Sequence, residues 1–412
     1  MTLDSFPTTR PAFTANFARS QKMIPQSTFG RASQATSPAV PSPGTVVGSN
    51  KVSLSYYNTP RFNWKDGKCQ GLLLEGSKTN YLPNSENWAT WTSFINGPGE
   101  TMPTADKPAP DGSNNAVEIT FSSTYAESQI YYPSYGATPS SIITVSVWAR
   151  SVTGTTTFRL QVRGGSPINN YSTKTFTATT KWQRFTDTLT AFAGQGDFRI
   201  VKDGTDVGPI QFWGAQLEQG YFPTSYIPTS GATATRAADT LTLDIADAWN
   251  ADQQGTICTE LYLIYRIQDN DSQSNNTNMW RLENSTGSPS VVGLIMRGQA
   301  GGGDGGDIRP KTYFPAVNGS RINNRQIFLP DTTGPNVLYK VAQSWFNGTT
   351  SATSLNEVGY QGVNYERIGN DNENINNASA ERIGGFSQPM IVSRMCIYNS
   401  YSNKDQQVGL TQ

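Results

Sequence analysis

The stretch FWGAQLEQGYFPTSYIPTSGATATRAADTL, residues 212–241, carries the clearest structural signals in the chain. It opens with a strand-like run in which either Phe212 and Ala215 or Trp213 and Leu217 face a core, depending on the register. Two aromatic-proline turns follow, and proline cannot continue a central strand. The stretch therefore predicts the last strand of a β-domain, then a strap (YFPTSYIPT) laid back over the fold, and finally an exit linker at TRAAD.

Runs that alternate apolar and polar residues precede this stretch. In IITVSVWARS, for example, Ile143, Val145 and Val147 lie on one face and Thr144, Ser146 and Trp148 on the other. AVEITF, TTFRLQVRG, KWQRFTDTLTAF and DFRIVKDG alternate in the same way and are separated by turn residues. Period-two alternation is typical of half-buried strands. We therefore predict an antiparallel sandwich or jelly roll over residues 61–245.

A second series of alternating runs follows this domain. It includes GTICTELYLIYRI, MWRLEN, VVGLIMRGQ, LYKVAQSWFNG and MIVSRMCIYNS, with polar loops between them. SWFNG ends in an Asn-Gly pair, which is a hairpin signal. This series predicts a second β-sandwich over residues 246–412, so the fold class that we expect is all-β with two antiparallel β-sandwich domains.

Residues 1–60 differ in composition from the rest, because Pro, Ser, Thr and Ala dominate them, as in SQATSPAVPSPGTVVGSN. Repeated proline disfavours both helix interiors and central strands. We expect an extended N-terminal arm with local turns, ordered by lying on neighbouring subunits. A flexible leader is the alternative that composition leaves open.

The overall composition excludes several classes of protein. Hydrophobic residues make up 36% of the chain and charged residues 15%, while an aromatic share of 11% indicates a folded protein. Because 31 basic residues balance 31 acidic ones, no net field steers the chain towards nucleic acid or an anionic membrane. The sequence contains no apolar run long enough for a transmembrane helix, and MTLDSFPTTRPAF lacks the features of a signal peptide. We therefore expect synthesis in a cytoplasm and no membrane insertion.

Catalytic chemistry is restricted by two residue counts. The chain has no histidine, which removes the commonest general base and the Ser-His and Cys-His nucleophile systems. Its 3 cysteines, Cys69, Cys258 and Cys396, are far apart in sequence, which argues against a disulfide framework or a zinc cluster. A carboxylate pair could still hydrolyse glycosidic bonds, but no local motif singles one out. We therefore expect a protein that is not an enzyme.

Several motifs resemble a module of bacteriophage virion proteins. FGRASQAT, NTPRFNW and KCQGLLLEGSKTNYLPNSENW are similar to the opening of that module, and the segment ending in TRAAD is similar to its close. The matching opening residues are Arg31–Thr36, Pro60–Phe62 and Gly71–Asn80, and the resemblance covers residues 28–241. It implies a carbohydrate-binding-like jelly roll in a virion component.

The C-terminal half resembles a second family. ERIGGFSQPMIVSRMCIYNSYSNKDQQVGL is similar to the end of laminin-G or concanavalin-type sandwiches, with matching residues Ile383–Phe386, Ile391–Tyr398 and Ser402–Leu410. This resemblance covers residues 246–412 at most. Neither resemblance by itself establishes sugar binding, because a fold does not fix a function.

The best candidate for a sugar-binding site is the tyrosine-rich run STYAESQIYYPSYG. Aromatic rings can stack on the apolar face of a pyranose, while polar groups hold its hydroxyls. The candidate ligand-binding residues are therefore Tyr125, Tyr131, Tyr132 and Tyr135. Packing of these tyrosines against a neighbouring subunit or the arm is the structural alternative, because interfaces also favour tyrosine. Trp88 and Trp91 are expected in the core or under the strap.

Acidic loops offer a candidate calcium site. GGGDGGD supplies Asp304 and Asp307 on a pliable loop, and residues 370–374 (NDNEN) supply further oxygen ligands. Neither run matches an EF-hand, so a solvated loop is the alternative. Glu75 and Glu218 lie beside buried strands in the two most distinctive motifs. We expect them to cap turns or accept backbone hydrogen bonds rather than to bind metal.

Together these observations predict a bacteriophage structural virion protein, a tail fibre or spike component that binds host-surface glycans. The arm would attach it to other virion proteins, and the resemblance implies a homo-oligomer, most often a trimer, located in the virion. A capsid or tail decoration protein without a glycan role is the alternative. A secreted polysaccharide-degrading enzyme is disfavoured, because no third domain large enough to be catalytic is evident.

Overall fold

The computed structural model describes strands throughout the chain, together with the loops that join many of them. The described residues are 10–38, 52–55, 58–65, 67–97, 102–125, 128–135, 142–164, 169–171, 174–190, 196–205, 207–220, 222–246, 254–264, 277–283, 289–296, 308–311, 338–347, 354–360, 363–369, 382–384, 390–400, 406 and 410. Within them, strands dominate, and the helical residues are α1 (Phe17–Ser20), the 3-10 turn η1 (Trp88–Thr90), Gln406 and Leu410. The all-β fold class is confirmed.

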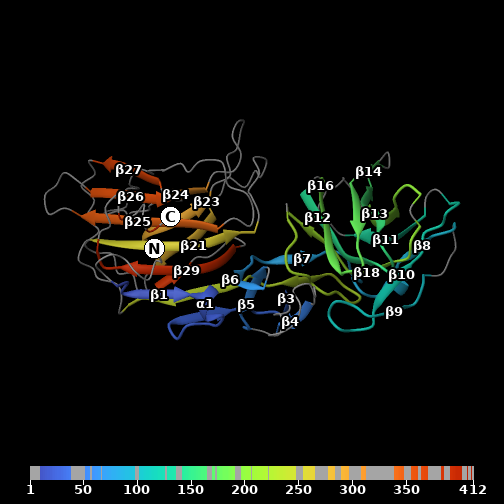
Figure 1. The fold of residues 1–412 in the computed structure, drawn as a ribbon, viewed down its shortest axis with the longest axis horizontal. Helices are drawn as coiled ribbons and strands as arrows, with labels where there is room; N and C mark the ends of the chain where they lie inside the picture. Colours follow the sequence, from blue (N-terminus) through green and yellow to red (C-terminus); the bar gives the residue numbers. More distant parts are fainter. Residues whose placement is uncertain are drawn as a thin grey trace. The chain divides into compact units, whose positions relative to one another are not determined.

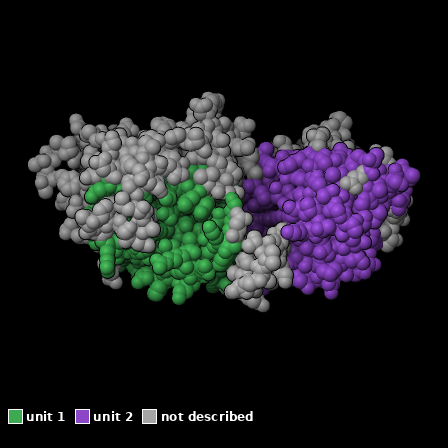
Figure 2. Space-filling model, in the orientation of Figure 1, with its two compact units in different colours: residues 1–31, 58–76, 238–412 green, residues 32–57, 77–237 purple. Residues whose placement is uncertain are grey.

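The chain forms two compact units that interleave along the sequence. Unit 1 comprises residues 1–31, 58–76 and 238–412, and unit 2 comprises residues 32–57 and 77–237 (Figure 2). These units differ from the contiguous division expected at residues 60 and 245. The reason is that early strands pair with strands from the distant C-terminal part, a choice that alternation within each strand cannot specify.

Unit 1 contains two antiparallel sheets. The larger has eight strands in the order β27-β26-β25-β21-β29-β6-β5, with β1 paired to β29. Its strands are β1 (Phe13–Asn16), β5 (Arg61–Lys65), β6 (Lys68–Leu74), β21 (Gln254–Leu263), β25 (Leu338–Asn347), β26 (Ser354–Tyr360), β27 (Val363–Gly369) and β29 (Met390–Tyr398). Figure 1 shows β25, β21 and β29 side by side. β29 is buried along its whole length.

The smaller sheet of unit 1 has six strands in the order β2-β20-β28-β22-β23-β24. These strands are β2 (Ser27–Gly30), β20 (Thr240–Asp244), β22 (Thr277–Glu283), β23 (Pro289–Met296), β24 (Ile308–Lys311) and β28 (Arg382–Gly384). All its pairings are antiparallel, as in the larger sheet.

The segment expected to form an extended arm contributes strands to both units. In unit 1, β1 pairs with β29 (Phe13↔Ile397) and β2 pairs with β20 (Phe29↔Leu241). In unit 2, β3 (Ala35–Pro38) pairs with β4 (Val52–Ser55). The run FTANF alternates, which buries Phe13 and Ala15 and allows strand pairing despite the surrounding prolines. Residues 1–9, 39–51 and 56–57 of the expected arm lie outside the described residues.

Unit 2 is a sandwich of two antiparallel sheets around one core. The five-stranded sheet has the order β16-β12-β18-β10-β9, and the six-stranded sheet has the order β14-β13-β17-β11-β8, with β15 paired to β13. Their strands are β8 (Thr92–Phe94), β9 (Ala105–Lys107), β10 (Ala116–Ile119), β11 (Gln129–Tyr135), β12 (Ile142–Ser151), β13 (Thr156–Gly164), β14 (Asn169–Tyr171), β15 (Thr175–Ala178), β16 (Gln183–Thr190), β17 (Gly196–Lys202) and β18 (Ile210–Gln219). A separate two-stranded sheet joins β7 (Lys78–Asn80) to β19 (Ala234–Arg236).

The core of unit 2 lies between these two sheets. Both sheets contribute apolar side chains to it, including Val145 and Val147 from β12 and Phe158 and Leu160 from β13. Trp88 and Trp91 belong to this core, with ring centroids 4.7 Å apart, which confirms the expectation for these two tryptophans.

A bulge in β18 explains why the sequence supported two registers. Gly214 has a φ of 61° in the left-handed region, and the pairing of β12 with β18 shifts between Ser146 and Trp148. Phe212 and Ala215, an odd number of residues apart, therefore both face the core, whereas Trp213 faces the opposite side. Glycine allows such a bulge at no steric cost. Leu217 also faces the core, so the first expected pair shares one side of the sheet, whereas the second pair, Trp213 and Leu217, is divided between the two sides.

Candidate functional site

The outer face of the six-stranded sheet of unit 2 is partly open. Along β13, Phe158, Leu160 and Val162 point into the core and are fully buried. The alternate residues Thr157, Arg159, Gln161 and Arg163 point the other way and are half-buried. This is the alternation that TTFRLQVRG predicts, and it leaves a polar row on the outside of the sheet.

Aromatic side chains lie on the same outer face, on β8 and β11. The ring centroids of Phe94 and Tyr131 are 5.8 Å apart. Tyr131 pairs across strands with Arg199 of β17, whose guanidinium carbon lies 4.7 Å from the centre of the tyrosine ring. Arg199 in turn pairs with Gln161 of β13, so the aromatic pair and the polar row are joined across β17.

Arg199 is held in a fixed orientation. Its Nε and Nη2 donate to the two carboxylate oxygens of Asp197, each at 2.5 Å, and its Nη1 donates to Oε1 of Gln129 at 2.9 Å. A guanidinium bound at both ends of its fork is a rigid support rather than a free ligand group. It therefore fixes the ring of Tyr131 from one side.

Two polar side chains on this face keep their hydrogen-bonding capacity. Among the described residues, neither Gln161 nor Arg163 has a side-chain partner, although both are half-buried. Exposed Thr175 and Thr177 of β15 lie opposite Arg159 and Thr157 on the edge of the same face. We define the outer surface formed by Phe94, Gln129, Tyr131, Thr157, Arg159, Gln161, Arg163 and Arg199 as the open face.

The four candidate tyrosines do not form one cluster. Tyr131 lies on the open face, whereas Tyr132, the next residue, packs against the core and lies 5.7 Å from the ring of Trp91. Tyr125 is half-buried in the loop before β11. Tyr135 pairs with Gly196 beyond an irregularity in β11, and its side chain lies outside the described part of the structure. Strand alternation separates Tyr131 from Tyr132, as it must for adjacent residues.

A buried lysine positions the loop that carries Tyr125. The Nζ of Lys202 donates to the carbonyl oxygens of Ser122 at 2.9 Å and of Tyr125 at 3.0 Å. The hydroxyl of Ser122 also accepts from the backbone N–H of Tyr125 at 3.0 Å. Tyr125 therefore sits on a constrained turn beside β11.

The expected calcium ligands Asp304 and Asp307, and residues 370–374, lie outside the described residues. Within the described part of the chain, no group of three or more His, Cys, Asp or Glu side chains is placed to hold a metal ion. The three cysteines are free, and Cys258 and Cys396 are buried cross-strand neighbours in unit 1. Burial raises the pKa of the Cys258 thiol, and Cys396 adds to that rise.

The outer face of the five-stranded sheet differs, because the strap covers part of it. Here the strap is residues 222–229, the described part of YFPTSYIPT. We define the covered face as the outer surface of this sheet around Trp213, Gln216 and Glu218 of β18. The side chain of Tyr226 packs against that of Trp213, with ring centroids 4.7 Å apart and the two ring planes tilted by 57°. β18 is consequently buried on both of its faces from residue 210 to residue 218.

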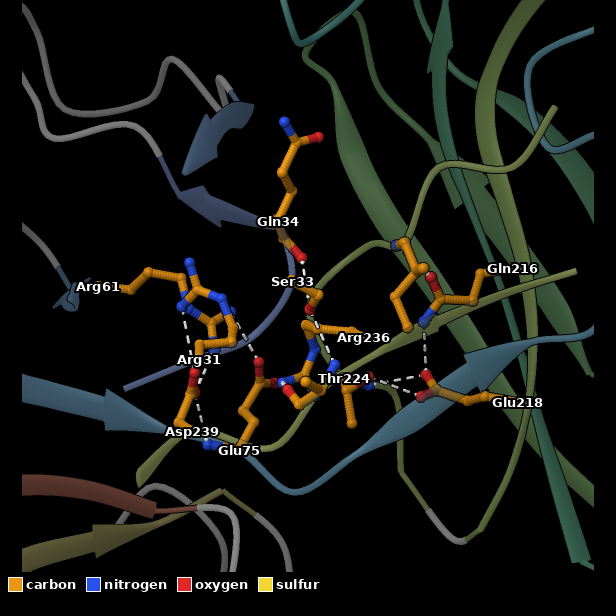
Figure 3. A network of polar contacts seen from close by, with 12 residues as sticks. Arg31, Ser33, Gln34, Arg61, Glu75, Gln216, Glu218, Thr224, Arg236 and Asp239 are labelled. Atoms are coloured by element: carbon orange, nitrogen blue, oxygen red, sulfur yellow. Dashed lines mark hydrogen bonds and ion pairs between the residues drawn. The ribbon is translucent and has the colours of Figure 1, made fainter. Parts of the chain in front are cut away.

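Glu218 binds the strap directly. Its carboxylate accepts hydrogen bonds from the backbone N–H and the hydroxyl of Thr224, both at 2.7 Å, and from Nε2 of Gln216 at 2.8 Å (Figure 3). The Nη1 of Arg184 donates to the carbonyl oxygen of Thr224 at 2.5 Å. Burial raises the pKa of Glu218, while Arg184 acts in the opposite direction. The expectation that Glu218 accepts backbone hydrogen bonds is confirmed.

Tyr226, a residue of the strap, attaches it to the rest of unit 2 at a second point. Its hydroxyl lies 2.6 Å from Oγ of Ser85 and donates to Oε1 of Glu86 at 2.8 Å. The other carboxylate oxygen of Glu86 accepts from Nδ2 of Asn115 at 2.6 Å. Burial raises the pKa of Glu86, and Asp111 adds to the rise, while the bonds from Tyr226 and Asn115 oppose it. Both carboxylates near the strap are thus engaged in holding it.

The motif residues that resemble the virion module meet in unit 1 as a buried ion network. The two arginines bind Asp239 and Glu75: Arg31 to Asp239 at 3.1 Å, and Arg61 to Glu75 at 2.8 Å and to Asp239 at 2.5 Å (Figure 3). The backbone N–H of Glu75 also donates to Asp239 at 2.9 Å. Burial alone would lower the pKa of Arg61, but Glu75 and Asp239 outweigh it and raise that pKa.

This network has a structural role. Its four side chains are almost completely buried, at 0–4% exposure, so no ligand reaches them. Removing one partner from such a network costs about 3–5 kcal/mol, because a charge is left buried without compensation. In the sequence, the members of this network stand out as charged residues within the short motifs RAS (Arg31), PRF (Arg61), LLLEG (Glu75) and RAAD (Asp239).

Sequence reasoning singled out Tyr131 but did not select Phe94, Gln161, Arg163 or Arg199 as site residues. The alternation of TTFRLQVRG and DFRIVKDG already placed the outward polar residues. What it lacked was the order of the strands, which brings β13, β17, β11 and β8 together. None of the helices in the described residues is long and apolar enough to cross a membrane.

Comparison with known proteins gives no family assignment. No family model matches the chain, and no curated protein matches it. Among solved structures, the CBM22-1-CBM22-2 tandem domain of Paenibacillus barcinonensis Xyn10C is 10% identical, with 79% of this chain and 97% of that chain covered and a TM-score of 0.28. A CBM4 structure is 21% identical, with 26% of this chain and 72% of that chain covered and a TM-score of 0.23. Ruminococcus gnavus IT-sialidase CBM40, bound to alpha2,3 sialyllactose, is 12% identical, with 39% and 82% covered and a TM-score of 0.26.

Proposed function

We propose that this chain is a bacteriophage virion protein that binds host-surface glycans through the open face of unit 2. The observation that carries the glycan-binding part is the composition of that face. It combines a half-buried aromatic pair, Phe94 and Tyr131, with two polar side chains, Gln161 and Arg163, that have no partner within the described part of the chain. Sugar recognition requires both an apolar surface for ring carbons and polar groups for hydroxyls.

The mechanism is binding without catalysis. The two carboxylates with raised pKa, half-buried Glu86 and buried Glu218, both accept hydrogen bonds from the strap. They lie on the side of β18 away from the core, whereas the open face belongs to the other sheet. A general acid must reach the glycosidic oxygen, and neither carboxylate belongs to the face that would hold the sugar.

The virion part of the proposal rests on the sequence resemblance of Arg31–Thr36, Pro60–Phe62 and Gly71–Asn80. A fibre or spike presents many copies of each module, so weak sugar contacts on one copy add up to strong attachment. We accordingly propose a homo-oligomer, with a trimer as the first state to test, bound to other virion proteins through residues 1–60. Sedimentation velocity of the purified full chain measures that state.

The test of glycan binding uses the full-length protein on an array of bacterial surface polysaccharides. The double variant Phe94→Ala/Tyr131→Ala should lose most of the binding, because it removes both rings on which the sugar would stack. Phe222→Ala serves as the matched control, since Phe222 is a half-buried aromatic of unit 2 outside the open face. Equal binding by the double variant and the wild type would contradict the assignment of the site. Absence of any bound polysaccharide, with particles still retaining the protein, would favour a capsid or tail decoration role.

A further inference from the structure

The charges of the open face do not balance. Among its described residues, the guanidinium of Arg199 is paired with Asp197, and that of Arg159 lies 3.2 Å from Asp203. Arg163 is the remaining cation, and it has no acidic partner. The face therefore carries one uncompensated positive charge.

The acidic residue opposite Arg163 on the neighbouring strand, Asp197, is bound by another arginine. Asp197 is the cross-strand neighbour of Arg163 in the pairing of β13 with β17. Both of its carboxylate oxygens, however, already accept hydrogen bonds from Arg199 at 2.5 Å. Arg163 has no partner among the residues that the structure describes, so its planar set of donors is available to a group from outside the protein.

The geometry of the sheet gives the distance between Arg163 and Tyr131, which a ligand that touches both must span. β13 and β11 are separated by β17, and Arg163 is two residues further along the sheet than the Gln161–Arg199–Tyr131 row. With strands about 4.8 Å apart and a rise of about 3.3 Å per residue, the Cα atoms of Arg163 and Tyr131 lie roughly 12 Å apart. A chain of two or more sugars is long enough to span this separation.

We infer that the open face binds an acidic polysaccharide, with a sugar carboxylate against Arg163 and a neighbouring sugar ring over the Phe94–Tyr131 pair. This inference rests on the proposed glycan-binding function and names its ligand class. A carboxylate matches the guanidinium because it can accept two parallel hydrogen bonds from the fork, and partial burial strengthens that pair relative to water. Gln161, on the same strand as Arg163, supplies a neutral donor and acceptor for adjacent hydroxyls.

The experiment measures binding of the full-length chain to a polysaccharide array that contains uronic acid polymers, the same polymers with methyl-esterified carboxylates, sulfated dextran and neutral dextran. The proteins compared are the wild type, Arg163→Gln and Lys181→Gln. Lys181 is an exposed residue of unit 2 between β15 and β16, so its variant loses one positive charge away from the open face. We expect binding of uronic acid polymers to fall about tenfold or more on esterification and by a similar factor in Arg163→Gln, but not in Lys181→Gln.

The possible outcomes separate this inference from the proposed function. Binding of neutral dextran or esterified polymers as tight as binding of the acids, unchanged in Arg163→Gln, overturns the acidic ligand and leaves glycan binding in place. Binding of sulfated dextran without uronic acid polymers overturns the carboxylate assignment. Binding to none of the array members overturns both the inference and the proposed function.

Discussion

The two outer faces of unit 2 belong to sheets of similar size, but the strap covers one of them and the other is open. On the open face, β13 keeps the alternation of buried and half-buried residues that a one-sided strand shows. On the covered face, β18 is buried on both sides, because the strap packs Tyr226 on Trp213 and is held by Glu218. The polar residues of the covered face therefore bind the protein itself, whereas those of the open face remain available to a ligand. The same residue types, glutamine, arginine and tyrosine, stabilise the fold on the covered face and form the proposed binding site on the open face.

The largest difference between the faces is expected for Glu218→Ala. This change leaves the N–H and hydroxyl of Thr224 and the amide of Gln216 without their acceptor inside the protein. We expect unit 2 to lose about 3 kcal/mol or more, because each unsatisfied buried donor costs about 1–3 kcal/mol. Urea unfolding and hydrogen exchange of the strap residues measure this loss.

The matched change on the open face is Gln161→Ala, which should alter stability by less than about 0.5 kcal/mol, as surface substitutions usually do. Equal losses for Glu218→Ala and Gln161→Ala would show that the two faces do not differ in the way described here.

Two glycine-to-alanine variants distinguish the cost of overpacking beneath the strap from the cost of backbone strain. Gly214 and Gly154 both have a φ of 61°, but only at Gly214 would an added Cβ meet Trp148 and Tyr226, each at 3.3 Å. Gly154→Ala should cost about 1 kcal/mol from the left-handed backbone alone, and Gly214→Ala about 2 kcal/mol, because overpacking adds to the strain. Thermal unfolding midpoints of the two variants compare these costs directly. If Gly154→Ala were the more damaging change, the close packing of the strap on β18 would be refuted.

Two tyrosine-to-phenylalanine variants, one on each face, compare how much a tyrosine hydroxyl contributes to stability. Tyr226→Phe removes a buried hydroxyl that bonds Ser85 and Glu86, so a loss of about 1–2 kcal/mol is expected. Tyr131→Phe removes a hydroxyl without a protein partner among the described residues and should leave the urea midpoint unchanged. Glycan binding adds a second measurement, because only Tyr131 lies on the proposed site. A destabilised Tyr131→Phe variant would mean that the open face is structural too.

The smallest expected effect is the change in folding stability with pH. Burial raises the pKa of Glu86 and Glu218 above that of the unfolded chain, so the folded state takes up protons at a pH where the unfolded state does not. Stability from these two groups is therefore fully present below the unfolded carboxyl pKa of about 4.3 and is lost as pH rises through the folded values. We expect a higher urea midpoint at pH 5 than at pH 7.5, and a smaller difference in Glu86→Gln/Glu218→Gln. A midpoint that falls on acidification in the wild type, but not in the double variant, would reverse the assigned sign.

The sequence predicts which residues of single strands point outward on the open face. It does not predict which strands lie side by side to form that face. TTFRLQVRG places Arg159, Gln161 and Arg163 on one side of a strand, and the tyrosine-rich run pointed to Tyr131. Tyr132 was grouped with Tyr131 because composition was considered without alternation, and the structure turns it towards the core. Arg199 could not be selected, because its pairing with Tyr131 depends on two strands far apart in the chain becoming neighbours.

The sequence by itself determined the local structure of this protein: the strands and their inward faces, the strap after β18 and the absence of histidine chemistry. Local alternation suffices for these features, because a strand's two faces follow from the geometry of its own backbone. The tertiary structure alone decided which residues form each unit, that RAS, PRF, LLLEG and RAAD meet in one ion network, and that one outer face of unit 2 is covered while the other stays open. These features depend on contacts between residues as distant as Arg31 and Asp239, and no local pattern encodes such contacts.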